Sequence, residues 1–255
     1  MRLEYCYLFA VTTLYKPKNL SRFTKRNGED PMIDQIDLYT NIHKGQRRRF
    51  FRIAMQAGNI DYADQTALDG LYDELNSFRD HMRLHANAEK KYIHPMLSER
   101  VPGGARKLEE DHRIINQQFD DLLTHLDGTR AKPVDLKKRR ELVLEFYRAW
   151  NRFLSFYFVH INKEEEQITP LLWKLCTNEE LATTFKTIMA SQKPDELRDS
   201  FVMMLPAMNL YERVEMIEAG QASMPPEAFQ GFLKLTEHLL SSEEWTALKT
   251  KLTSK

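Results

Sequence analysis

The chain has 255 residues, with 37 basic and 37 acidic side chains, so its formal net charge is zero. This balance gives no global attraction to nucleic acid or to an anionic membrane. The length allows one large domain, or a domain with a smaller companion. Only 9 glycines and 10 prolines interrupt long stretches rich in Leu, Met, Glu and Lys, which indicates an all-α protein.

Neither the cysteines nor the apolar segments indicate export or membrane insertion. Cys6 and Cys176 lie far apart and match no metal-binding or redox spacing. A short apolar run at residues 5–12 lacks the flanks and cleavage site of a secretory signal. No stretch approaches the roughly 20 apolar residues that a spanning helix needs. The sequence therefore predicts a soluble, cytoplasmic protein that binds neither nucleic acid nor membranes.

Helical periodicity divides the chain into three predicted parts. Residues 1–31 end in a turn-rich segment and are expected to form a poorly ordered N-terminal arm. Apolar residues then recur at helical spacing in four long stretches, at residues 33–57, 62–99, 105–126 and 133–175. Short connections between them favour an up-down-up-down four-helix bundle over residues 32–177. Further helices predicted at residues 179–190, 194–218, 226–240 and 243–252 form an appended C-terminal module over residues 178–255.

One pattern of histidine, glutamate and proline occurs twice in the predicted bundle. The copies are His85, Glu89 and Pro95, and His160, Glu164 and Pro170. Residues four apart share one face of a helix, so each copy directs an imidazole and a carboxylate toward one point. Each proline is expected to kink the helix or to end its regular turns.

The other two predicted bundle helices each add one well-placed histidine. The resulting candidate metal ligands are His43, His85, Glu89, His112, His160 and Glu164. This mixed nitrogen and oxygen set suits iron or manganese, with zinc as a further alternative. A single histidine on an amphipathic helix is more often a surface or core residue. Burying the whole set without a cation would leave costly unpaired groups, which favours a metal site.

Four remaining histidines fit the pattern less well. His81 precedes His85 by one turn and is interpreted as a neighbour of the site, although a role as a replacement ligand stays open. The others lack a partner pattern and are interpreted as non-ligands: His94, His125 and His238.

The order of these residues resembles that of the hemerythrin-like, or HHE cation-binding, family. The resemblance covers about residues 33–176 and rests on His43, the two repeated motifs and Asp111-His112-Arg113. It implies a four-helix bundle with a non-haem di-iron centre and with dioxygen or nitric oxide as the small ligand. Glu89 and Glu164 would bridge the two irons, and the histidines would be terminal ligands.

The chain departs from the oxygen-carrying members of that family at two positions. Those members have His-x-x-x-His on the third helix, whereas Asn116 stands four residues after His112 here. They also end with His-x-x-x-x-Asp, whereas Glu164 follows His160 by four residues. One iron would then have an open position, or one completed by water, Asn116 or another side chain. Sensing or redox reactivity is therefore as consistent with the sequence as reversible oxygen carriage.

The predicted function is a metal-binding protein that binds or senses dioxygen, nitric oxide or iron, rather than a dedicated enzyme. One alternative is a di-iron oxidoreductase of the bundle type. Another is a metal-free signalling or scaffold protein that works through residues 179–255, the candidate surface for a protein partner. A ferritin-like centre is disfavoured because it needs two Glu-x-x-His motifs, and only Glu109 to His112 fits.

Overall fold

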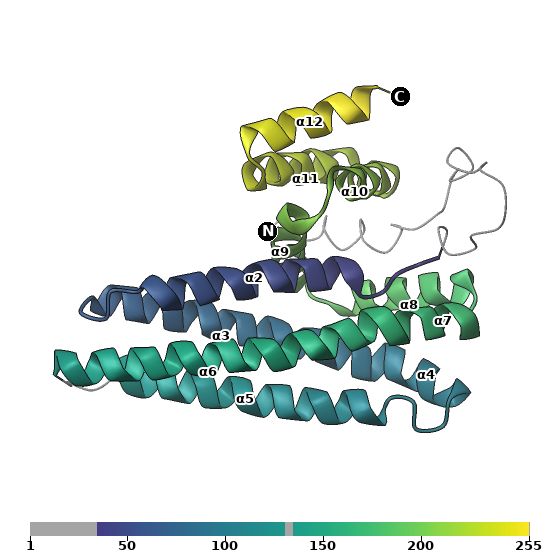
Figure 1. Cartoon of the computed structure of the whole chain (residues 1–255). Coiled ribbons are helices and arrows are strands. Elements are labelled where there is room, and N and C mark those ends of the chain that lie inside the picture. The colour runs from purple at the N-terminus through teal and green to yellow at the C-terminus, as the bar shows by residue number, and fades with distance from the viewer. Residues whose placement is uncertain (1–34, 131–134, 255) are drawn as a thin grey trace, which may run out of the picture. The chain divides into compact units, whose positions relative to one another are not determined.

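The computed structural model describes residues 35–130 and 135–254, and every regular element in these ranges is a helix (Figure 1). The arm predicted at residues 1–31 lies outside the described residues. Two compact units divide the remainder: residues 47–168 form one, and residues 35–46 with 169–254 form the other. No described helix is both long and apolar enough to cross a lipid bilayer. The predicted domain limits at residues 32, 177 and 178 stay predictions.

Four long helices build the predicted bundle and confirm the all-α fold class. They are α2 (Thr40–Asn59), α3 (Gln65–Ala88), α5 (Arg106–Arg130) and α6 (Leu136–Lys163). Helix α2 begins later than predicted because the Asp37 carboxylate accepts hydrogen bonds from the backbone N–H groups of Tyr39 and Thr40, at 2.8 and 2.9 Å. A side chain that satisfies these free donors marks the start of a helix.

An aromatic cluster forms part of the buried core of the bundle. Phe50 of α2 is fully buried, and its ring centroid lies 4.6 Å from those of Phe78 on α3 and Tyr157 on α6. Phe119 of α5 joins the cluster through Phe153, at 5.3 Å. Rings from all four helices therefore interlock, and such packing fixes the helices relative to one another.

Each repeated motif leads directly into one turn of π-helix. Glu89 opens η1 (Glu89–Ile93), which continues as α4 (His94–Arg100), and Glu164 opens η2 (Glu164–Ile168), which continues as α7 (Thr169–Leu175). A proline six residues after each glutamate has no N–H, and its ring crowds the carbonyl four residues earlier. A π turn, with bonds from residue i+5 to residue i, accommodates this break. The expected kink is thus a π turn that begins at each glutamate.

The C-terminal helices have a small apolar core of their own. They are α8 (Asn178–Ser191), α9 (Pro194–Met204), η3 (Leu205–Ala207), α10 (Leu210–Ser223), α11 (Pro226–Leu239) and α12 (Ser242–Thr253). The prediction of a single helix at residues 194–218 is wrong. The chain breaks after η3, and Asn209 caps α10 by accepting hydrogen bonds from two backbone N–H groups. Val214, Ile217 and Phe232 pack in the core of these helices.

Candidate metal centre

Glu89 joins histidines from two helices. Its Oε1 lies 2.8 Å from Nε2 of His85, one turn earlier on α3. Its Oε2 lies 3.0 Å from Nε2 of His112 on α5. Glu89 is only 2% exposed. One buried carboxylate therefore presents a separate oxygen to each of two imidazoles.

Glu164, the first residue of η2, also approaches two histidines, but through a single oxygen. Its Oε1 lies 3.2 Å from Nε2 of His160 and 3.6 Å from Nε2 of His112. The His112 and His160 rings meet edge to face, with centroids 4.6 Å apart. His112 consequently stands between two buried carboxylates.

Two groups of donor atoms in residues 47–168 are compact enough to hold a metal ion. Glu89, His94 and His112 form one group, and His112, His160 and Glu164 form the other; in each group the donor atoms lie within 4.8 Å of one another. His94 was not among the predicted ligands. His43, on α2, is fully buried, and its role as a ligand stays a prediction.

The unpaired polar atoms of these groups fit a cation. Neither oxygen of Glu89 has a well-aligned hydrogen bond within the described residues, although two imidazole nitrogens are near. Both ring nitrogens of His94 also lack a hydrogen-bond partner within the described residues. Buried polar groups are normally paired, because leaving them without a partner is costly. A cation coordinated by these nitrogens and oxygens would satisfy them, and the donor types suit iron, manganese or zinc.

The pKa shifts indicate that the position of His112, between Glu89 and Glu164, favours positive charge. Burial would lower the pKa of His112, but contact with the carboxylates of Glu164 and Glu89 raises it to about 10. Burial would raise the pKa of Glu89, but the charge of His85 and contact with His112 hold it well below its usual value. Without a metal, the protonated imidazole of His112 is thus the cation between the two carboxylates.

The metal-free protein should lose stability as the pH rises from about 6.5 toward about 10. The folded-state pKa of His112 exceeds its ordinary value of 6.5, so its stabilising contribution is complete below that pH and is lost as the pH rises through about 10. Glu164 acts in the acid range: burial and the charge of Glu89 raise its pKa, but contacts with His112 and His160 lower it overall. Its contribution is therefore lost as the pH falls below the ordinary value of 4.5.

Denaturant unfolding of chelator-treated protein across this pH range measures the effect. The variant His112→Gln cannot gain the proton and should show a flatter alkaline profile. An alkaline loss of equal size in this variant would contradict the assignment to His112.

A small cavity adjoins the histidines. Its volume is about 10 Å³, and its lining residues are Met82, His85, Ala86, His112, Ile115, Asn116, Tyr157 and His160. Asn116 therefore faces the same space as three predicted ligands. His81 lies nearby in sequence but belongs to neither of the two donor groups within residues 47–168. Burial is the main cause that lowers its pKa to about 3. A neutral His81 stacked on Phe78, with ring centroids 6.4 Å apart, is consistent with the predicted role of a neighbour.

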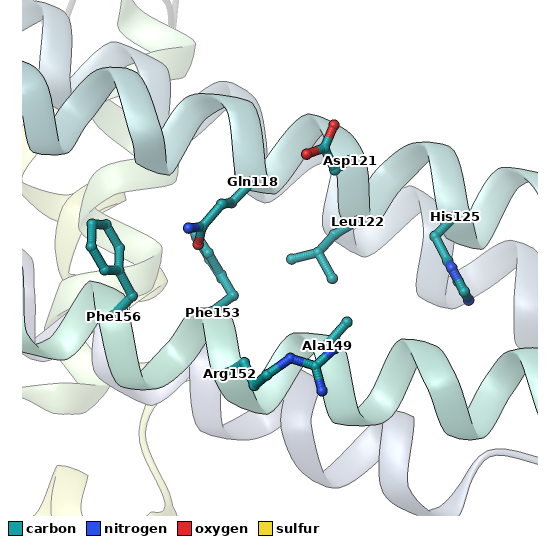
Figure 2. A pocket seen from close by; sticks show the side chains of 8 residues that line it. All are labelled: Gln118, Asp121, Leu122, His125, Ala149, Arg152, Phe153 and Phe156. Atoms are coloured by element: carbon teal, nitrogen blue, oxygen red, sulfur yellow. The ribbon is translucent and has the colours of Figure 1, made fainter.

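A larger groove lies elsewhere along α5 and α6 (Figure 2). Its volume is about 440 Å³, and its lining residues are Gln118, Asp121, Leu122, His125, Ala149, Arg152, Phe153 and Phe156. None of these is a predicted ligand. His125 is held by the Leu142 carbonyl, 2.9 Å from its Nε2. The chemistry of the bundle is therefore concentrated at the small cavity and not at the large groove.

The fold and the site together define a class: a four-helix bundle whose buried histidines and glutamates can hold metal cations. The chain belongs to the hemerythrin family, because residues 34–172 match the model described as Hemerythrin HHE cation binding domain. This match confirms the resemblance drawn from the ligand order.

One curated protein extends the comparison. F-box/LRR-repeat protein 5 of Xenopus laevis is 22% identical over 164 residues, which make up 63% of this chain and 23% of that protein. The similarity thus leaves most of the relative's length uncovered. No solved structure matches the chain at a significant level.

Proposed function

We propose that this protein holds two non-haem iron ions and binds or senses a small molecule through them, either dioxygen or nitric oxide, or that it responds to iron itself. The main support is Glu89, whose two oxygens face imidazoles from two different helices at 2.8 and 3.0 Å. A carboxylate shared by two ions would direct one oxygen toward each of them. The hemerythrin family relationship supports the same proposal.

The proposed ligand set follows the two halves of the sequence pattern. His43 and His85 would hold one ion, His112 and His160 would hold the other, and Glu89 and Glu164 would be shared. Ferrous ions in these positions would supply electrons and a coordination position for the small ligand. The aromatic core beside the centre would keep bulk water away, because Tyr157 is almost fully buried.

The small cavity supports a ligand of very few atoms. A volume of about 10 Å³ is close to the least that accommodates a single water. Asn116 lines this cavity, and a side-chain amide both donates and accepts hydrogen bonds. We propose that Asn116 hydrogen-bonds the small ligand, while Met82 and Ile115 restrict its size.

Anaerobic reconstitution with ferrous iron tests the proposal. Two irons per chain are expected, followed by a change in the visible absorption spectrum when dioxygen or nitric oxide is added. Iron at background level would contradict the metal proposal. Reversal of the change on removing the gas supports binding or sensing, whereas steady consumption of an added reductant supports the oxidoreductase alternative.

The remaining hypotheses concern which metal is bound and whether the protein has a protein partner. Manganese and zinc stay alternatives, and elemental analysis of the reconstituted protein compares the three metals. A partner surface at residues 179–255 stays a prediction, as does the metal-free scaffold. Partner capture that survives metal removal but not deletion of residues 179–255 would support the scaffold.

A further inference from the structure

We infer that His94 is a ligand of the second metal ion, beside His112 and His160, an inference that rests on the proposed metal function. His94 is 1% exposed. Its donor atom lies within 4.8 Å of donor atoms of Glu89 and His112, and its ring is stacked on that of His112 with centroids 5.5 Å apart. Neither of its nitrogens has a hydrogen-bond partner within the described residues.

A structural role explains this histidine poorly. The nearest charged partner is Glu109, whose Oε1 lies 3.7 Å from Nδ1 of His94. That distance is too long for a hydrogen bond. Glu109 is half exposed, with 50% of its side chain accessible, so it has water as an alternative partner. A buried imidazole with two unpaired nitrogens beside a buried carboxylate is better explained by a cation.

The π turn places His94 at the centre. Successive side chains of a regular α-helix are rotated by about 100° around the helix axis. A side chain five positions after Glu89 would therefore point about 140° away from that of Glu89. In η1 the N–H of His94 instead donates to the carbonyl of Glu89, which is the i+5 to i bond of a π-helix. The π turn that Pro95 favours therefore brings His94 toward the helix face that carries Glu89.

His94 also compensates for a residue that α5 lacks. Asn116 follows His112 by one helical turn and faces the same small cavity as His112 and His160. A histidine there would offer a third nitrogen to the second ion. With Asn116 in place, His94 provides that third nitrogen from α4.

Cobalt(II) titration of the full chain tests this inference separately from iron chemistry. His94→Gln should retain one cobalt ion with unchanged affinity and bind the second at least about tenfold more weakly, since even changes outside the ligand set weaken metal sites by about 10–100-fold. The paramagnetic NMR spectrum should lose one shifted imidazole N–H signal. His125→Gln is the matched control in the same bundle and should keep both ions and all signals. Circular dichroism of the metal-free variants checks that each is folded.

Moving the imidazole from position 94 to position 116 gives a second, independent test of the ligand role. The double variant His94→Gln with Asn116→His should regain the second cobalt ion, and it remains informative if His94→Gln alone folds poorly. Two ions and an unchanged spectrum in His94→Gln would overturn the inference. Normal cobalt binding without any iron-dependent response to gas would overturn the proposed function but not the role of His94. Failure of the wild type to bind cobalt or iron would overturn both.

Discussion

Replacing Glu164 with glutamine should remove most of the bound iron, reducing it from two ions per chain to one or fewer. Glu164 is fully buried, and its Oε1 faces His160 and His112 at 3.2 and 3.6 Å. The substitution nearly preserves the shape of the side chain but removes the negative charge that attracts the cations. Since the carboxylate is proposed to be shared, both ions should bind more weakly.

Thermal unfolding with and without ferrous iron measures this loss as well. A ligand at about 100 times its dissociation constant stabilises a protein by about 2.7 kcal/mol, so a roughly 100-fold loss of affinity largely removes the effect. Glu166→Gln is the matched control, because Glu166 lies in the same π turn but is exposed to solvent. It should keep its iron and its iron-dependent stabilisation. Equal iron contents in the two variants would contradict the proposed role of Glu164.

Replacing Phe50 with alanine should lower the free energy of unfolding by about 3–5 kcal/mol, because truncating a buried phenylalanine leaves a cavity. Phe50 is fully buried and contacts rings from α3 and α6. The cavity would lie at the point where the helices that carry the ligands meet. Iron affinity should therefore fall together with stability, although Phe50 is not a ligand.

The neighbouring Phe51 provides the control for this prediction. Its side chain is 54% exposed, so Phe51→Ala should cost less than about 1 kcal/mol. Urea denaturation of the two metal-free variants makes the comparison. Similar losses of stability would show that the aromatic cluster does not carry the packing energy assigned to it.

Local sequence rules predicted most of the helices and the family resemblance. The spacing of four between His85 and Glu89, and between His160 and Glu164, places each pair on one helical face irrespective of the rest of the chain. Helix boundaries were predicted less well where capping decided them. Asp37 delays the start of α2, and Asn209 starts a new helix inside the range predicted at residues 194–218.

His94 shows why a helical pattern alone missed a residue of the centre. His94 has no partner pattern along the helix, and in a regular α-helix its side chain would point away from Glu89. The useful signal was the proline itself, which has no N–H for the α-helical bond and thereby favours a π turn ahead of it. The same proline spacing recurs after Glu164, where η2 forms.

The sequence by itself determined the class of fold, the two histidine and glutamate pairs and the chemical preference for a cation, because these depend on helical spacing and side-chain type. Tertiary structure alone decided that His112 stands between Glu89 and Glu164, that Asn116 faces a small cavity and that His94 approaches Glu89. These relations join residues of different helices or of a π turn. They depend on how the helices pack and on where their regular hydrogen bonding is interrupted, which spacing along one helix does not specify.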